Sequence, residues 1–308
     1  MKILVILTGG TIGSSFCQEY ISLDSNSKNT LLDNYTHLEI DTIHPYTILS
    51  EQLEGEYLNK LIECVGANLH KDYDGIIITH GTDTLQYSAS ALSVAYSDAK
   101  IPIVVVSSNY ILSDPKANGK DNFKYAVEFI KEKVGGVFVS YKNTGSKPEI
   151  HRGRALLPHE IYSDNLKSVD MAFGYFEDNI FKRQDEYTAT NIVKNVKFSK
   201  NAQVLWIKIH PGMLLPDTKN YKAILMEGYH SGTLPTLSKE FRAFCNSANV
   251  PIFLVGAKEG APYESAKEYK ALKIKHLPFI SPIYAYIRLW TEACGDNDFE
   301  KAYSDLCN

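Results

Sequence analysis

The chain has 308 residues, of which 44% are hydrophobic and 22% charged, a composition typical of a globular protein with a sizeable core. Its formal net charge of -4 gives no general attraction to nucleic acid or to an anionic membrane. No apolar run approaches the roughly 20 residues of a membrane-spanning helix, and the five cysteines are widely spaced with no CxxC or Cys/His pattern, so neither a membrane protein nor a disulfide framework or metal site is predicted. The N-terminus lacks the features of a secretory signal, and a cytoplasmic location is therefore expected.

The first thirteen residues, MKILVILTGGTIG, predict a buried strand that ends in a glycine turn bearing hydroxyl groups. Gly9 and Gly10 allow positive φ and close backbone approach, while Thr8 and Thr11 place hydroxyls where the strand ends. Ligands bind at the carboxyl ends of the strands in open α/β sheets. The turn is therefore a candidate for nucleophilic or phosphate chemistry, although a tight turn whose threonines only cap backbone groups explains the residues equally well.

A polar connection follows from residue 14 to about 35 and has the length of a functional lid. Tyr20 is an aromatic anchor in this connection, for which surface packing is the simpler explanation. After a strand near residues 36–43, Ser50 and Glu51 precede a helix that starts near residue 55. A helix start favours a bound anion such as a carboxylate, whereas an isolated serine there is more often an ordinary cap.

A second apolar strand, Ile76–Ile78, ends in another hydroxyl-bearing glycine turn, Gly81-Thr82-Asp83, before a helical pattern that begins at Leu85. Asp83 at a helix start is favourable by about 0.3–1 kcal/mol through the helix dipole alone, so a purely structural role would explain it. However, two strands of parallel type each deliver a threonine to the same sheet edge. We therefore expect Thr11 and Thr82 to converge.

The remaining pattern predicts two α/β domains. Strands near 101–106 and 136–141, separated by a helix near 121–133, complete a doubly wound, flavodoxin- or Rossmann-like domain over residues 1–186. Residues 187–202 are predicted to be an exposed linker. A smaller C-terminal α/β domain is predicted over residues 203–308, with strands near 203–209, 222–227 and 251–256 and helices near 238–247, 281–293 and 298–306.

The two threonine loops, TGGTIG and DGIIITHGTDTLQYSASALS, occur in an order that resembles the bacterial-type (type I/II) asparaginase/glutaminase family, with cytoplasmic type I proteins the nearer likeness. The segments PIVVVSSNYILSDPKANGKDNFKYAV, WIKIHPG and MEGYHSGTLP are also similar to the family's pattern. The resemblance implies hydrolysis of the side-chain amide of L-asparagine or L-glutamine to the acid and ammonia, without a metal or cofactor. It also implies a homodimer or homotetramer that acts on a small amino-acid substrate rather than on nucleic acid or a membrane.

Carried over by position, the resemblance assigns catalytic roles to four residues. Thr11 matches the nucleophile, Tyr20 the lid tyrosine beside it, and Thr82 with Asp83 the second threonine and the aspartate that holds the substrate α-amino group. The implied substrate-binding set is Gly10, Ser50, Glu51, Gly81, Thr82 and Asp83, with Ser50 matching the serine that binds the α-carboxylate. The chemistry agrees, because amide hydrolysis needs an oriented nucleophile and donors for the oxyanion.

One departure from the family is chemically important. The lysine that supports the family's Thr-Asp pair has no counterpart, because either Leu157 or Pro158 occupies its position and no lysine occurs between Lys147 and Lys167. In one hypothesis the chain is still an amidohydrolase, with another base such as His159 or Lys147 as the substitute. In a second, it has lost hydrolysis and binds an amino acid or a partner. In a third, the same chemistry acts on a different amide within an amidotransferase-like assembly.

A nucleotide-binding function is disfavoured by the same glycine loop. TGGTIG has neither the GxGxxG spacing of a dinucleotide site nor the lysine of a P-loop.

Overall fold

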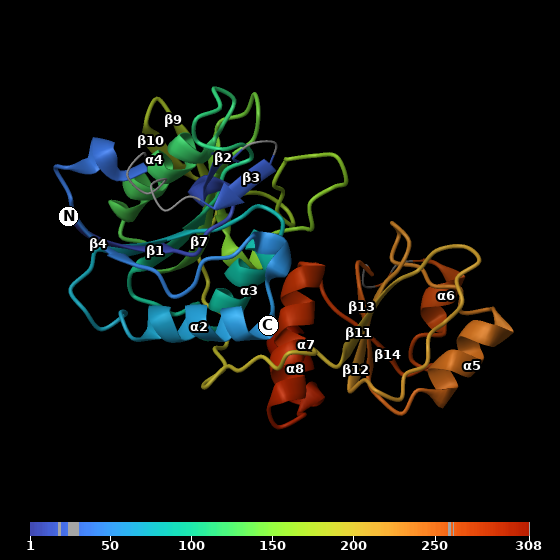
Figure 1. Ribbon diagram of the computed structural model, residues 1–308. Helices are drawn as coiled ribbons and strands as arrows, with labels where there is room; N and C mark the ends of the chain where they lie inside the picture. Colours follow the sequence, from blue (N-terminus) through green and yellow to red (C-terminus); the bar gives the residue numbers. More distant parts are fainter. Residues whose placement is uncertain (18–19, 24–30, 258–259, 261, 308) are drawn as a thin grey trace. The chain divides into compact units, whose positions relative to one another are not determined.

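The computed structural model describes residues 1–17, 20–23, 31–257, 260 and 262–307, with only the backbone described for residues 16–17 and 20–23 (Figure 1). The chain divides into two compact units, Met1–Val196 and Lys197–Asn308. Each unit contains a sheet with helices, which confirms the predicted α/β class.

The N-terminal unit is built on an eight-stranded sheet in the order β10-β9-β8-β7-β6-β5-β1-β4. Five of its strands are parallel to one another: β1 (Lys2–Leu7), β4 (Glu39–Ile43), β5 (Gly75–Thr79), β6 (Pro102–Val106) and β7 (Gly136–Lys142). Antiparallel pairings then extend the sheet through β8 (Pro148–Arg152), β9 (Gly174–Glu177) and β10 (Ile180–Arg183). The central strands are continuous apolar runs, as expected for parallel strands that are covered on both faces.

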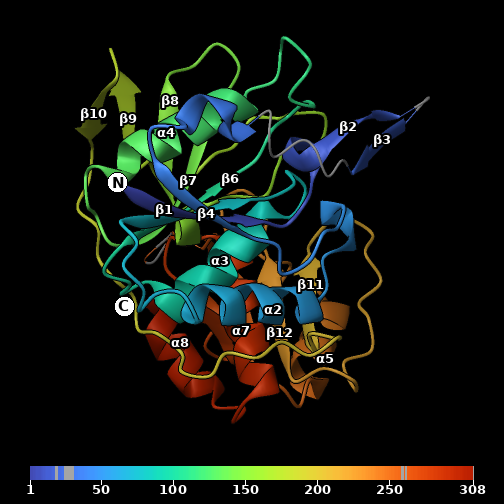
Figure 2. The same cartoon turned by 60° about the vertical axis from the view of Figure 1, so that its left-hand side comes forward.

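Helices cover the two faces of this sheet. Helices α2 (Gly55–Gly66) and α3 (Leu85–Tyr96) lie on one face, and α4 (Gly119–Ile130) lies on the other (Figure 2). Two phenylalanines of α4, Phe123 and Phe129, are fully buried in the core cluster that also contains Val104 and Phe138 of the sheet. The strand ends that carry the candidate site therefore belong to a well-packed core.

Short elements connect these layers. They are the 3-10 turns η1 (Thr11–Gly13), η2 (Asp33–Tyr35), η3 (Ser50–Gln52) and η4 (Gly153–Ala155), and the antiparallel hairpin of β2 (Ser14–Cys17) and β3 (Tyr20–Leu23). The hairpin lies within the predicted lid, where the sequence analysis expected only a polar connection. Turn η4 packs on α3, where a Cβ on Gly153 would lie 2.7 Å from the Ser93 hydroxyl oxygen.

The C-terminal unit has a parallel sheet in the order β11-β12-β13-β14. The strands are β11 (Val204–Lys208), β12 (Ala223–Glu227), β13 (Ile252–Val255) and β14 (Ile274–His276), and the helices are α5 (Lys239–Ser247), α6 (Glu264–Lys267), α7 (Pro282–Cys294) and α8 (Phe299–Cys307). Within the described part of the chain, every helix is too short or too polar to cross a membrane.

Part of the predicted linker belongs to the N-terminal unit and packs on it. The Tyr187 ring lies 4.9 Å from that of Phe138, and its hydroxyl donates a hydrogen bond to the Ser97 carbonyl. The backbone N–H of Val193 donates to the Val94 carbonyl. The contact boundary falls after Val196, inside the predicted linker, and the domain limits at residues 186 and 203 remain predictions.

Candidate active site

Two glycine loops touch through their backbones at the carboxyl edge of the large sheet. Strands β1 and β5 are parallel neighbours, with Leu7 opposite Thr79, so both loops leave the sheet at the same edge. Gly10 has φ +75°, and a Cβ there would lie 2.2 Å from the Gly81 nitrogen. Only glycine fits this contact. Thr11 and Thr82 directly follow these glycines, so the structure brings the two threonine loops together.

Ser50 lies against the same pair of loops. The Gly10 N–H donates to the Ile48 carbonyl at 3.0 Å, which attaches the segment before η3 to the first loop. A Cβ on Gly81 would lie 2.4 Å from the Ser50 hydroxyl oxygen. Ser50 is only 4% exposed, and its hydroxyl donates to Asp83 Oδ2 at 3.0 Å. Ser50 and Asp83, both predicted to bind substrate, are therefore in direct contact.

The hydroxyls of the two loops fall into two groups. The Thr8 hydroxyl donates to the Thr79 carbonyl at 2.6 Å, and that of Ser14 donates to the Gly10 carbonyl at 2.8 Å, so these two residues brace the turn. Thr11 and Thr82 are half-buried, and their hydroxyls make no hydrogen bond with any residue the structure describes. Thr11 and Thr82 thus differ from Thr8 and Ser14, whose hydroxyls are bonded within the protein.

His80 is a residue of this site to which the sequence analysis gave no role. It is fully buried, with Nδ1 2.9 Å from the Gly81 carbonyl and Nε2 2.8 Å from the Ser88 hydroxyl. Burial lowers the pKa of His80, so the ring is neutral at ordinary pH, with its proton assigned to Nδ1 by the carbonyl it faces. His80 therefore fixes the turn that presents Thr82. The sequence signal for this role was the position of His80 directly between the end of strand β5 and Gly81.

The stretch in which the family resemblance would place a lysine pairs with residues 167–169. The Leu157 N–H donates to the Lys167 carbonyl at 2.9 Å, and Leu156 is fully buried. The two suggested substitutes are engaged elsewhere: Lys147 is ion-paired with Glu177 at 2.6 Å, and His159 Nδ1 lies 3.2 Å from the Asn165 carbonyl. Across the described residues, no lysine, arginine or histidine side chain is paired with Thr82 or Asp83.

Two further predicted site residues lie at the margin of this cluster. Glu51 is exposed in η3, next to Ser50. Tyr20 begins strand β3, which contacts the Thr11 turn, but its side chain lies outside the described part of the structure. In the described ranges, no group of three or more His, Cys, Asp or Glu side chains is arranged to hold a metal ion.

Sequence comparison finds relatives that are named as amidotransferase subunits and a relative that is named as an L-asparaginase. A glutamyl-tRNA(Gln) amidotransferase subunit of Methanosphaera stadtmanae is 30% identical over 246 residues, which cover 73% of this chain and 55% of that protein. The L-asparaginase of Thermococcus kodakarensis is 26% identical over 247 residues, which cover 76% of this chain and 73% of that protein. The chain thus spans about half the length of the amidotransferase relative.

Structural comparison finds the same fold over nearly the whole chain. The thermostable L-asparaginase from Thermococcus kodakarensis superposes with a TM-score of 0.84 at 22% identity, covering 99% of this chain and 97% of that one. L-asparaginase I from Vibrio cholerae gives a TM-score of 0.79 at 17% identity, covering 99% and 96%. The pattern of the family described as "Asparaginase, N-terminal" matches residues 2–161. Because this match spans slightly more than half of the 308 residues and contains both threonine loops, the protein belongs to the asparaginase family.

Proposed function

We propose that this protein is an amidohydrolase that releases ammonia from the side-chain amide of L-asparagine or L-glutamine, with Thr11 as the nucleophile. The observation that supports this most directly is the backbone contact between Gly10 and Gly81, since it places the loops of Thr11 and Thr82 side by side. Both threonine hydroxyls are free of hydrogen bonds to the described residues and are therefore available to a substrate.

The contact between Ser50 and Asp83 supports an amino acid as the substrate. Asp83 is exposed and its carboxylate is suited to a substrate α-ammonium group, while the Ser50 hydroxyl is a donor for an α-carboxylate. In the free protein these two groups bond to each other at 3.0 Å. Binding of a zwitterion would exchange that one bond for two charge-assisted ones, with Gly10, Gly81 and Glu51 lining the same site.

The reaction then requires a covalent step at Thr11. Its hydroxyl oxygen would bond to the amide carbon, and the oxygen that becomes negative would be stabilised by backbone N–H groups of the glycine loops. Ammonia leaves as the C–N bond breaks, and water later cleaves the ester between Thr11 and the acyl group. We propose Tyr20, Thr82 and Asp83 as the residues that assist proton transfer.

A second candidate function is the binding of an amino acid without hydrolysis. This alternative is favoured by the absence, among the described residues, of any basic side chain paired with Thr82 or Asp83. The names of the amidotransferase relatives also keep an amidotransferase-like assembly as a third hypothesis. A cytoplasmic location and a homodimer or homotetramer remain proposals under each alternative.

The decisive experiment measures ammonia release from L-asparagine and L-glutamine by wild type and by Thr11→Ala. The matched control is Ser14→Ala, which loosens the same turn by removing the 2.8 Å bond to the Gly10 carbonyl but leaves the nucleophile. We expect Thr11→Ala to lose at least about 1,000-fold in rate and Ser14→Ala to lose far less. Equal rates for wild type and Thr11→Ala would refute the enzymatic proposal. Aspartate binding by calorimetry without turnover would then support the second candidate.

A further inference from the structure

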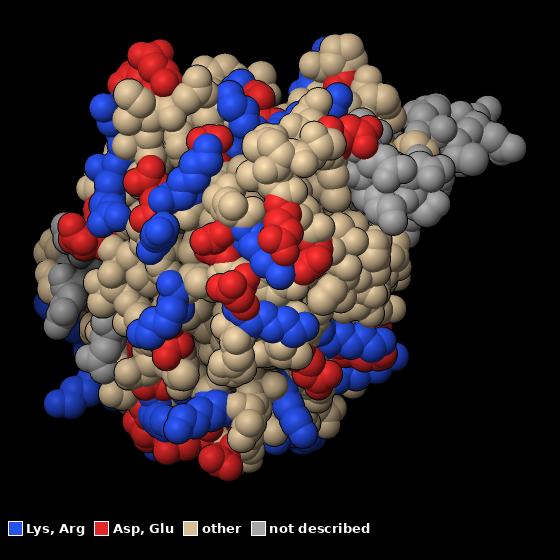
Figure 3. Space-filling view, turned by 90° about the vertical axis from the view of Figure 1, so that its left-hand side faces the viewer, with Lys and Arg blue, Asp and Glu red and all other residues tan. Residues whose placement is uncertain are grey.

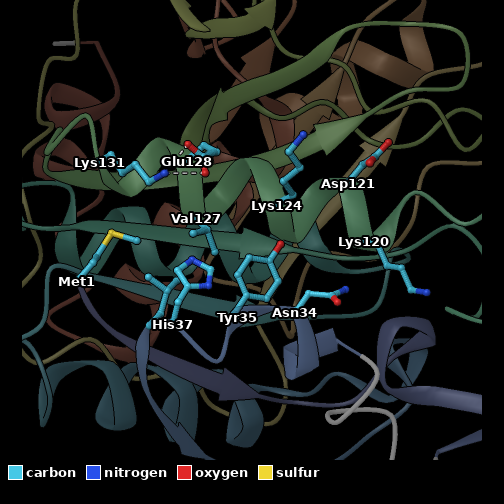
Figure 4. A pocket seen from close by; sticks show the side chains of 11 residues that line it. Met1, Asn34, Tyr35, His37, Lys120, Asp121, Lys124, Val127, Glu128 and Lys131 are labelled. Atoms are coloured by element: carbon cyan, nitrogen blue, oxygen red, sulfur yellow. Dashed lines mark hydrogen bonds and ion pairs between the residues drawn. The ribbon is translucent and has the colours of Figure 1, made fainter. Parts of the chain in front are cut away.

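A groove of about 730 Å³ lies on the N-terminal unit, and its lining contains no residue of the two threonine loops (Figure 4). It runs between one face of α4, which contributes Lys120, Lys124 and Val127, and the segment from Asn34 to Leu38. Met1 and Leu38, at the amino ends of β1 and β4, also line it, whereas Thr11 follows the carboxyl end of β1. Thr11, Thr82 and their neighbouring loop residues are not among the residues that line the groove, so it is a different site from the candidate active site.

The floor of the groove is apolar and contains a flat ring. Tyr35 packs edge-on against Phe123 of the core at a centroid distance of 5.1 Å, and Leu38 and Val127 flank it in the groove. Figure 4 shows the Tyr35 hydroxyl directed toward α4, into the groove. Within the described ranges this hydroxyl has no hydrogen-bond partner, and burial, followed by the charges of Glu128 and Asp121, raises the Tyr35 pKa to about 12. A neutral phenol is thus available as a donor above an apolar floor.

The charges around the groove leave an excess of cations. Both acidic residues already have a cationic partner, since Asp121 is ion-paired with Lys142 at 2.6 Å and Glu128 with Lys131 at 2.7 Å. Lys124 donates to the neutral Asn179 side chain at 2.8 Å and forms no ion pair with a described residue.

Lys120 makes no ion pair with any residue that the structure describes. In Figure 4 it lies at the same end of the groove as Asn34. This end can accept an anionic group from a ligand.

The anion is expected to be small. On the side of the molecule shown in Figure 3, lysine and arginine atoms intermingle with those of aspartate and glutamate, without an extended patch of one sign. A long polyanion such as nucleic acid prefers a continuous basic surface. A volume of about 730 Å³ instead falls within the range for small-molecule sites.

We propose that this groove binds a small aromatic molecule that carries one carboxylate or phosphate group. The ring lies over the floor formed by Tyr35, Leu38 and Val127, where offset or edge-on aromatic contacts are favourable. The anionic group is held by Lys120 and the Asn34 amide, and the Tyr35 hydroxyl donates to a polar atom of the ligand. The site is independent of the amide-hydrolysing function proposed for Thr11.

Calorimetry and NMR titration of the full chain with four probes test this proposal. The probes are benzoate, phenyl phosphate, neutral benzamide and inorganic phosphate. We expect saturable binding of benzoate or phenyl phosphate, with benzamide and inorganic phosphate each at least about tenfold weaker because one of the two contacts is missing. The stronger of the two aromatic anions identifies which anionic group the site prefers. The proposal is overturned if neither saturates, or if benzamide binds as tightly as both.

Three variants locate the ligand. Lys120→Gln should weaken binding of the preferred probe about tenfold. Lys131→Gln removes a charge from the same groove, but at a lysine already ion-paired with Glu128, so it should change the affinity less than about twofold. Tyr35→Phe should weaken binding severalfold while keeping the ring. Equal weakening by both lysine variants would indicate only a general charge effect and would overturn the site. Thr11→Ala should bind the probe as tightly as wild type does. Weaker binding by this variant would place the ligand in the candidate active site and would overturn the proposal.

Discussion

The Ser50 hydroxyl donates a 3.0 Å hydrogen bond to the Asp83 carboxylate, although the two residues are 33 positions apart in the chain. The bond joins the loop after β4 to the loop after β5, and Thr84 strengthens the join by donating to the Ser50 carbonyl at 2.7 Å. The two groups that would recognise the charged ends of an amino acid are therefore assembled before any ligand arrives. Such preorganisation reduces the entropy lost on binding.

Ser50→Ala should raise KM for the amino acid by about tenfold or more, with a smaller change in kcat, because a charge-assisted hydrogen bond to the α-carboxylate is lost. The free energy of unfolding should change by less than about 1 kcal/mol, since Asp83 is exposed and water can replace the hydroxyl. Steady-state kinetics measures KM and kcat, and chemical denaturation measures the free energy of unfolding. Thr84→Ser, which keeps a donor to the Ser50 carbonyl, is the control. A fall in kcat with unchanged KM would contradict the assigned role.

Gly10→Ala should destabilise the protein by about 3 kcal/mol or prevent folding, because the new Cβ would lie 2.2 Å from the Gly81 nitrogen at φ +75°. Gly145→Ala is a close control, since Gly145 has φ +74° but no atom within 4 Å of the added Cβ. That variant carries the cost of backbone strain alone, about 1 kcal/mol. Urea denaturation compares the two. Equal destabilisation would show that backbone conformation, rather than the contact between loops, requires glycine at position 10.

On the alignment that puts the family's lysine at Leu157, Leu157→Lys should increase ammonia release by about tenfold or more, because the new ammonium group would be the charged partner that Thr82 and Asp83 lack among the described residues. Pro158 occupies the lysine position in the alternative alignment and is exposed, so Pro158→Lys is the matched comparison. The measurement is the rate of ammonia release at saturating L-asparagine. A higher rate in Pro158→Lys alone would show that the alignment with Pro158 at the lysine position is correct. If neither variant is faster than wild type, the missing lysine does not limit the rate.

The stability of the protein should fall as the pH decreases from about 6.5 toward 4, partly because of His151. This residue is 2% exposed, and burial lowers the pKa of its imidazole from 6.5 to about 4. Between these values the unfolded chain binds a proton that the folded chain does not, so lowering the pH favours unfolding, by up to about 3 kcal/mol in total.

His151→Gln tests this contribution because it removes the titrating ring and keeps a side chain able to bond to Ser168, whose hydroxyl lies 2.8 Å from His151 Nδ1. Denaturation between pH 7 and pH 4.5 should show a shallower pH dependence in the variant. Some dependence should persist, because burial also lowers the pKa of His80. Identical slopes in wild type and variant would assign the acid sensitivity to other groups.

The central strands and the two threonine loops could be predicted from the sequence because their signals are local. Apolar runs such as Lys2–Leu7 and Gly75–Thr79 are long enough to identify buried strands, and the adjacent glycines mark the turns. The convergence of Thr11 with Thr82 followed from parallel topology alone. The contact between Ser50 and Asp83 did not, because it depends on β4 and β5 both pairing with β1 and on the exact path of η3.

The antiparallel extension of the sheet could not be predicted, for a different reason. Strands β8, β9 and β10 have only four or five residues each and carry charged side chains, so no period is evident. Contacts between aromatic rings that are far apart in the sequence stabilise their order: the Phe173 ring centroid lies 5.2 Å from that of Phe138 and 6.0 Å from that of Phe181. Tertiary packing of this kind overrides weak local preference. The same limit applies to the β2–β3 hairpin within the predicted lid.

The contact between Gly10 and Gly81 has an evolutionary consequence. The backbones of Gly10 and Gly81 touch, and the side chains of Thr8, Ser14 and His80 brace the loops, so the shape of the site does not depend on the hydroxyls of Thr11 and Thr82. Substitutions at positions to which the family resemblance assigns a catalytic role, such as Leu157 or Pro158 in place of a lysine, can then occur without disturbing the loops. Loss of a catalytic side chain therefore need not destabilise the loops, and a chain that no longer hydrolyses an amide could still bind it.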